Sequence, residues 1–208
     1  MWTWGKSNLW NVGQAFGKGV SALMFAALLC MPSAADATAK RPHLTPVKET
    51  AAPEGFAGVC TRYTWACARA GGSKHGSREL MRMADEVNQA INRSTREVSD
   101  EAQYARSEYW ALPTARGGDC EDFALAKKQA LIGRGVAPQN LLIATVLDRK
   151  RNPHAVLVMR TESGDFVLDN LTDRILDWRA TGYTFLRMQN PSSPGHWSAI
   201  LTGGILGG

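Results

Sequence analysis

Cys120 is the residue in this sequence best suited to covalent chemistry. It lies in the segment GGDCEDFA at residues 117–124, where a glycine turn leads into a predicted helix. Further along the chain, His154 opens one apolar segment and Asp169 closes the next. A thiol at a helix start, a histidine and a carboxylate are the parts of a Cys-His-Asp triad. We therefore expect Cys120, His154 and Asp169 to be the catalytic residues.

The chemistry explains why these residue types belong together. A thiol attacks only as thiolate, and its pKa falls at a helix N-terminus and beside an imidazolium. Asp169 would hold the second ring nitrogen of His154 and fix its tautomer. Taken alone, His154 could be a strand-end histidine bonded to backbone, and Asp169 a turn residue. Of the four histidines, however, only His154 opens an apolar strand that is followed by an acid-tipped one.

The elements that must position these residues can be predicted from apolar periodicity. A helix should run over residues 121–132, ended by Gly133 and Gly135, and another should begin at Arg78. Strands are expected at 141–147, 154–161 and 165–168, with a short one near 183–188. A nucleophile helix packed on an antiparallel sheet is an α+β single domain.

Three acids surround the predicted nucleophile: Asp119, Glu121 and Asp122. Carboxylates so close to a thiol raise its pKa and oppose the thiolate. One interpretation is that Asp119 caps the helix while the other two complement its positive end. The other is a bound Ca²⁺, which prefers oxygen ligands and would cancel the repulsion. Spacing alone favours the capping interpretation.

The N-terminal residues 1–37 are typical of an export signal. Lys6 and Lys18 precede a short apolar run at 20–30, and small residues follow Pro32. The run is too short to span a bilayer as a helix, although an uncleaved anchor and lipidation at Cys30 are the rival interpretations. We thus expect a periplasmic or secreted protein with a flexible lead-in at 38–55, one domain at 56–200 and a disordered tail at 201–208.

Charge and cysteine content narrow the function further. Removing residues 1–37 lowers the formal charge of +5 by one, and the remaining charge is spread along the chain without a basic run. This excludes a typical nucleic-acid site. Three cysteines remain, and an odd count in an exported protein suggests one pair and one free thiol. A Cys60–Cys67 disulfide is the expected pair, with two reduced cysteines as the alternative.

Aromatic residues are embedded in the polar stretch 92–116, just upstream of the nucleophile. They are Tyr104, Tyr109 and Trp110. They could line a substrate cleft or pack this stretch onto the core, and the sequence favours neither.

Taken together, these segments resemble the bacterial transglutaminase-like cysteine proteinase family. The resemblance rests on three blocks in order, GDCEDFAL at 118–125, HAVL at 154–157 and VLDN at 167–170. Shorter matches are Val87-Asn88, Tyr109-Trp110, Leu141-Leu142-Ile143 and Gly182-Tyr183, and the resemblance covers about residues 55–200.

The resemblance implies a papain/transglutaminase-like fold and a Cys120-His154-Asp169 triad. The family includes the LapG-type periplasmic proteases, which need calcium and cut surface adhesins. The resemblance therefore implies that Asp119 and Glu121 are calcium ligands, with Asp122 adjacent to them. It also implies a protein substrate such as a surface adhesin, and a membrane-bound regulator.

The sequence supports an exported cysteine endopeptidase that works through a thioacyl-enzyme. An acyltransferase would use the same triad, with an amine replacing water. A non-catalytic binding module on this fold is the third hypothesis, and the complete set of triad residues argues against it.

Overall fold

The computed structural model describes residues 43–69 and 75–207 of the chain. The predicted signal peptide at residues 1–37 lies outside these residues. Within them, none of the helices combines the length and the apolar character needed to cross a bilayer.

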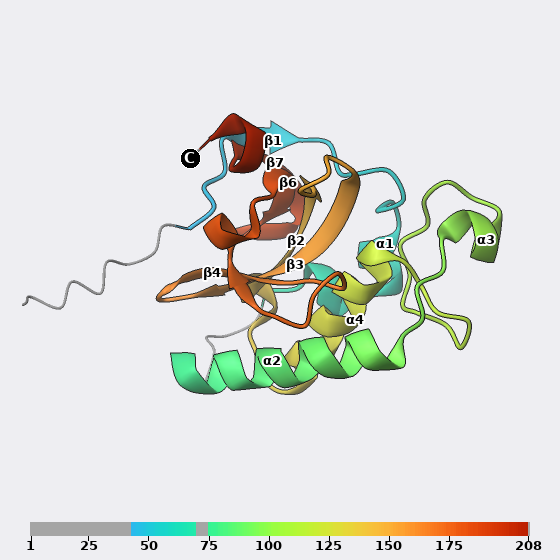
Figure 1. Ribbon diagram of the computed structural model, residues 1–208, viewed down its shortest axis with the longest axis horizontal. Helices are drawn as coiled ribbons and strands as arrows, with labels where there is room; N and C mark the ends of the chain where they lie inside the picture. Colours follow the sequence, from blue (N-terminus) through green and yellow to red (C-terminus); the bar gives the residue numbers. More distant parts are fainter. Residues whose placement is uncertain (1–42, 70–74, 208) are drawn as a thin grey trace, which may run out of the picture. The chain divides into compact units, whose positions relative to one another are not determined.

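One seven-stranded antiparallel sheet forms the centre of the fold (Figure 1). Its strand order is β1-β7-β6-β2-β3-β4-β5, so the strand from the lead-in lies at one edge. The strands are β1 (Lys48–Thr50), β2 (Leu141–Leu147), β3 (Pro153–Thr161), β4 (Gly164–Leu168), β5 (Leu176–Asp177), β6 (Thr184–Asn190) and β7 (Ser193–Thr202).

The helices lie mainly on one side of this sheet. In Figure 1, α4 lies beneath β2 and β3, and α2 lies beneath α4, which agrees with the packing of α4 on both strands and of α2 on α4. The helices are α1 (Val59–Arg62), α2 (Ser77–Ser94), α3 (Asp100–Tyr104) and α4 (Cys120–Gly133), with short 3₁₀ turns η1 (Thr64–Cys67), η2 (Pro138–Asn140), η3 (Trp178–Thr181) and η4 (Gly204–Leu206). Helices packed on one antiparallel sheet, with Cys120 at the start of α4, confirm the predicted α+β class.

Both faces of the central strands are buried, which explains their nearly continuous apolar sequences. In β2, Leu141 and Ile143 pack toward α2 and α4, whereas Leu142, Ala144 and Val146 pack into a second cluster. That second cluster also holds side chains from β3, β6 and β7. Since side chains alternate across a strand, only a strand covered on both faces reads as apolar throughout.

The structure differs from the sequence prediction at both ends of the domain. The lead-in, predicted to be flexible, contributes β1 to the sheet, and the buried Asp165 carboxylate accepts a hydrogen bond from the Leu44 N–H at 2.8 Å. The sequence predicts disorder from residue 201, whereas β7 continues through Thr202 and η4 follows. The short strand predicted near 183–188 corresponds to β6, and no strand was predicted over β7, where Pro194 and Gly195 interrupt the strand pattern.

Cys60 and Cys67 form the expected disulfide, with their Cα atoms 5.4 Å apart. The bond closes the segment of α1 and η1. This segment supports the chain that follows α3, because an Arg62 nitrogen donates to the Trp110 carbonyl at 2.7 Å. Cys120 is the free cysteine of the described residues.

Candidate active site

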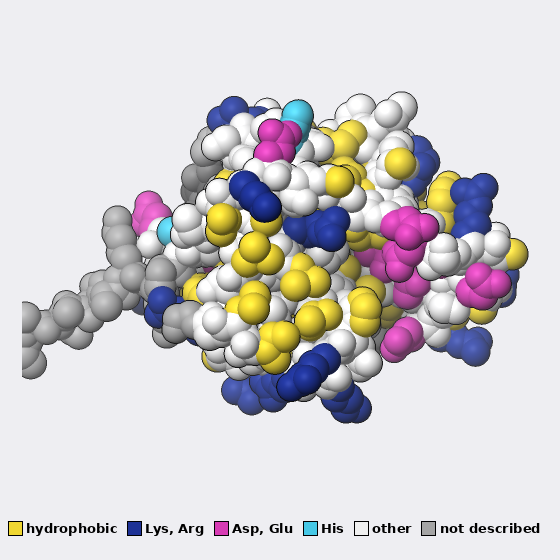
Figure 2. Space-filling model, turned by 90° about the horizontal axis from the view of Figure 1, so that it is seen from above, with side chains coloured by type: hydrophobic (Ala, Val, Ile, Leu, Met, Phe, Trp, Pro, Cys, Tyr) yellow, Lys and Arg dark blue, Asp and Glu magenta, His cyan; other side chains and the backbone are white. Residues whose placement is uncertain are grey.

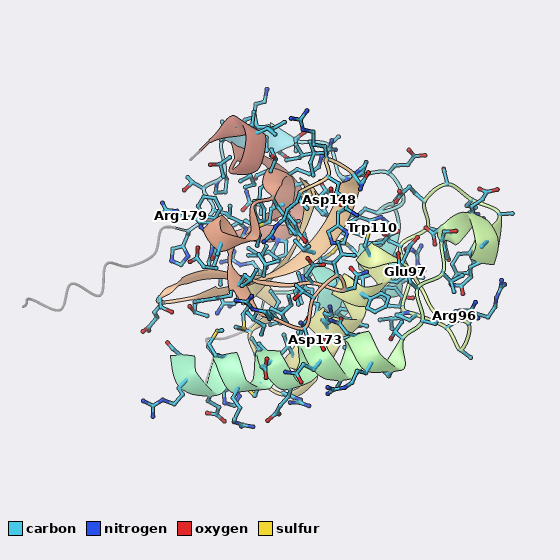
Figure 3. The ribbon with its side chains drawn as sticks, in the orientation of Figure 1. Arg96, Glu97, Trp110, Asp148, Asp173 and Arg179 are labelled. Carbon is cyan, nitrogen blue, oxygen red and sulfur yellow. A yellow bond between two sulfur atoms is a disulfide. The ribbon has the colours of Figure 1, made fainter. Side chains whose placement is uncertain are left out.

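Cys120 is the first residue of α4, and two glycines allow the chain to enter the helix there. Gly117 has φ +126°, and a Cβ at this position would lie 2.0 Å from the Arg96 carbonyl oxygen. The N–H of Gly118 donates to that same oxygen at 3.1 Å. Residues 96–98 and 117–118 therefore lie side by side, and this contact holds the start of α4 (Arg96 and Glu97 are labelled in Figure 3).

His154 and Asp169 lie at the adjoining ends of the neighbouring strands β3 and β4. The His154 Nε2 atom is 2.8 Å from the Asp169 Oδ1 atom, and both side chains are buried. Asp169 also accepts from the Leu171 N–H at 3.0 Å and from the Tyr183 hydroxyl at 2.5 Å. Although burial alone would raise it, these partners, with His154 foremost, hold the pKa of Asp169 below its ordinary value. The carboxylate therefore stays charged beside the imidazole.

A cleft of about 280 Å³ brings the helix and the sheet together at this point. Cys120 from α4 and His154 from β3 both line it. Its other walls carry Pro53, Glu54, Glu108, Trp110, Glu121, Thr145, Val146, Pro153, Ala155, Leu186 and Arg187. The thiol and the imidazole thus share one solvent-accessible hollow, as nucleophile and base must.

The stretch at 92–116 supplies one wall of this cleft. Trp110 lines the cleft and is also 2% exposed, packed edge-on against Phe56 and Trp197. It therefore serves both roles that the sequence left open. Tyr104 and Tyr109 instead pack edge to face against each other, with ring centroids 4.9 Å apart. Neither tyrosine lines the cleft.

The surroundings of Cys120 oppose the thiolate. Burial raises the pKa of Cys120, and the Glu121 carboxylate raises it further, whereas a backbone hydrogen bond with Ala155 lowers it. The Cys120 thiol donates to the Glu121 Oε2 atom at 3.2 Å, which holds the proton on sulfur. On the face of the molecule that Figure 2 shows, acidic side chains gather at one side of an apolar area.

An acidic cluster next to the thiol unites Asp100, Asp119 and Glu121. One carboxylate oxygen from each lies within 4.8 Å of the others. Asp100 Oδ1, Asp119 Oδ1 and Glu121 Oε1 are buried and have no hydrogen-bond partner. Buried oxygens left without partners are costly unless a cation or water satisfies them. This donor set fits a hard cation such as Ca²⁺.

The cluster differs from the ligand set predicted from the sequence. Asp119 occupies the N-cap position of α4 but makes no side-chain cap bond, so the capping interpretation does not apply to its carboxylate. Its Oδ2 atom accepts from the Asp100 N–H instead. Asp122 is not part of this cluster. Its Oδ1 atom accepts from the Ala111 N–H at 2.8 Å, and its Oδ2 atom is buried without a hydrogen-bond partner.

Asp100 was missed because nothing in the local sequence links it to Cys120. It starts the short helix α3, and its carboxylate also accepts a hydrogen bond from the Tyr109 N–H. The pairing of residues 96–98 with residues 117–118 brings it to the start of α4. Only a prediction of that long-range contact could have revealed it.

This arrangement of a thiol on a helix and a histidine–carboxylate pair on a sheet is the architecture of papain-like cysteine peptidases. The sequence profile of the bacterial transglutaminase-like cysteine proteinases (BTLCP) matches residues 47–204. The chain therefore belongs to this family and is a cysteine peptidase, as the sequence blocks indicated.

Among solved structures, the chain is similar to LapG of Legionella pneumophila. The calcium-bound form is 28% identical, and the alignment covers 57% of this chain and 67% of that chain with a TM-score of 0.47. The EGTA-treated form is also 28% identical and has a TM-score of 0.47, with 57% and 66% covered. This chain thus spans about two thirds of those structures. No curated protein matches.

Proposed function

We propose that this protein is an exported cysteine endopeptidase that cuts proteins through a thioacyl-enzyme. Cys120 is the nucleophile, His154 the general base and acid, and Asp169 the residue that orients the imidazole. The observation that carries the proposal is the 2.8 Å bond between His154 and Asp169 at a cleft that His154 shares with Cys120.

In this proposal each ring nitrogen of His154 has a separate role. Nε2 is bonded to Asp169, so Nδ1 is the nitrogen left to serve the thiol. In the first step His154 takes the Cys120 proton as sulfur attacks the peptide carbonyl. The same proton then passes from His154 to the leaving amine, and a thioester remains on Cys120. Water, deprotonated by His154, hydrolyses that thioester and restores the free thiol.

Asp100, Asp119 and Glu121 would hold a calcium ion beside the nucleophile. When bound, the ion supplies positive charge that offsets the carboxylates and favours the thiolate. The buried oxygen of each residue that now lacks a hydrogen-bond partner would then coordinate the ion. The proposal rests on the three partnerless oxygens of this chain.

We place the enzyme outside the cytoplasm, because residues 1–37 are typical of an export signal and the chain forms a disulfide. Its substrates would then be periplasmic or surface proteins, of which a surface adhesin is the specific candidate. A membrane-bound regulator belongs to the same proposal.

The experiment incubates the mature protein and calcium with surface and periplasmic proteins of its host. New protein N-termini are then identified by mass spectrometry. We expect defined new termini with the native protein and none with Cys120→Ala or His154→Ala. Incorporation of a labelled amine in place of cleavage would support the acyltransferase. If neither reaction depended on Cys120, the proposal would be wrong.

A further inference from the structure

Tyr183 contacts both members of the pair that acts on Cys120. Its hydroxyl donates to the Asp169 Oδ2 atom at 2.5 Å, while its ring meets the His154 ring edge-on, with centroids 6.0 Å apart. We propose that Tyr183 is a positioning residue that holds the Asp169 carboxylate and the His154 imidazole in their catalytic orientation. This inference rests on the proposed function.

The two carboxylate oxygens of Asp169 have different hydrogen-bond partners. Oδ1 bonds His154 Nε2 and the Leu171 N–H, and Oδ2 bonds the Tyr183 hydroxyl. Without Tyr183, the second oxygen would lack its side-chain donor, and rotation about χ2 could turn Oδ1 away from the imidazole. Asp169 and Tyr183 both line a second cavity, of about 560 Å³. The hydroxyl therefore stabilises one rotamer of the carboxylate.

Tyr183 is itself held from two sides. Its N–H donates to the Thr181 Oγ1 atom at 3.0 Å, and an Arg149 nitrogen donates to the Thr181 carbonyl at 2.6 Å. Gly182, with φ +72°, provides the left-handed turn between these residues. Tyr183 is 8% exposed and packs in the apolar cluster that includes Trp178 and Phe185. Its position is thus set by the fold, independently of Asp169.

The hydroxyl can act only as a donor toward Asp169. Burial raises the pKa of Tyr183, and its bond to the Asp169 carboxylate raises it further. Other charged groups near the pair come from different elements: Asp148 (labelled in Figure 3) and Arg149 from the turn between β2 and β3, and Lys127 from α4. None of these has a hydrogen bond to the Asp169 carboxylate among the described residues. Tyr183 is therefore the side-chain partner that fixes Oδ2.

The test compares Tyr183→Phe with Tyr63→Phe in the mature, calcium-supplied protein. Tyr63 is a matched control, because its hydroxyl also makes a hydrogen bond, accepted from the Leu112 N–H at 3.2 Å. Its ring packs against a different apolar cluster from that of Tyr183. One readout is solvent exchange of the His154 Nε2 proton, followed by NMR and assigned by its loss in His154→Gln. The other is kcat and KM for a substrate identified as described above.

We expect Tyr183→Phe to speed exchange of that proton at least about tenfold and to lower kcat about tenfold or more with KM unchanged, as loss of a hydrogen bond to a charged group predicts. Tyr63→Phe should change neither. If Tyr183→Phe kept native exchange and native kcat while His154→Gln was inactive, the inference would be overturned and the proposed function would stand. If the native protein cut no substrate but Tyr183→Phe still loosened the proton, the proposed function would fail and the positioning role would stand.

Discussion

The Asp119 Oδ2 atom accepts a hydrogen bond from the Asp100 backbone N–H at 3.1 Å, although the two residues are 19 positions apart. Each of these aspartates keeps its other oxygen buried and without a partner. The starts of helices α3 and α4 are thus held together by carboxylates that we propose as calcium ligands.

Asp100→Asn should weaken calcium binding by about tenfold or more, because a site's affinity depends on how many charged ligands it has. Calorimetric titration of the mature protein measures this directly. Calcium at about 100 times its Kd should stabilise the native protein by about 2.7 kcal/mol, and chelation should remove that gain. Glu101→Gln is the matched control, since Glu101 is an exposed acid of the same helix outside the cluster. Equal binding heats in all three proteins would refute the site.

Asp122→Asn should leave calcium binding unchanged, because the Asp122 carboxylate lies outside the cluster of Asp100, Asp119 and Glu121. Its Oδ1 atom accepts a hydrogen bond from the Ala111 N–H. The substitution keeps the accepting oxygen, so the free energy of unfolding should fall by no more than about 1–3 kcal/mol. The same titration, together with urea denaturation, checks both expectations. Loss of calcium binding with native stability would instead restore Asp122 to the ligand set.

His154→Ala should lower kcat/KM by about 10²–10⁴-fold, which is the usual contribution of a general acid–base residue. It should also slow alkylation of Cys120, since no imidazolium would stabilise the thiolate. Rates of iodoacetamide labelling with calcium present provide the measurement, and His196→Ala is the control because His196 is exposed and bonded to Glu49. Native labelling in His154→Ala would contradict the triad.

Lys128→Met should be neutral or stabilising by up to about 4 kcal/mol, because it replaces a fully buried ionisable side chain with an apolar one. The Lys128 Nζ atom donates to the Gln189 Oε1 atom at 2.8 Å, and burial lowers the pKa of Lys128 to about 7. In the unfolded chain that pKa is about 10.4. Between these values folding releases a proton, so native stability should rise with pH across this window.

Urea denaturation from pH 7 to 10 checks this slope. Lys128→Met should reduce it, whereas Lys150→Met, at an exposed lysine, should retain it. If the free energy of unfolding rose with pH equally in both variants, Lys128 would be charged in the folded protein.

Replacing Cys60 and Cys67 together by serine should lower the free energy of unfolding by roughly 2–3 kcal/mol, as expected for a short closed loop. Non-reduced peptides from exported protein should contain the Cys60–Cys67 bond and a free Cys120. Mass spectrometry decides the pairing. A bond from Cys120 to either of the others would contradict its assignment as the nucleophile.

Much of the fold could be predicted because its signals are local. Each of these signals lies within or beside the element that it predicts. They are the glycine turn before Cys120, the apolar runs of β2 and β3, and the apolar stripe of α2. The three candidate triad residues lie within such elements or at their ends. The predicted strands at 141–147 and 165–168 accordingly correspond to β2 and β4 within one residue.

What could not be predicted depends on contacts between distant segments. Asp100 reaches the nucleophile only because residues 96–98 pair with residues 117–118. Tyr183 was visible in the sequence, but its bond to Asp169 depends on how η3 turns into β6. Part of the lead-in forms β1 by pairing with β7, and a strand of three residues is too short to show a periodic pattern in the sequence.

Because β1 pairs with β7, the lead-in supplies the edge strand on one side of the sheet. Residues 48–50 lie opposite Trp197, Ser198 and Ala199, whose other side is occupied by β6. An enzyme trimmed beyond Thr50 would present this row of backbone donors and acceptors to the strands of other molecules, a known route to aggregation. Residues 48–50 therefore protect the protein against aggregation as well as completing its sheet.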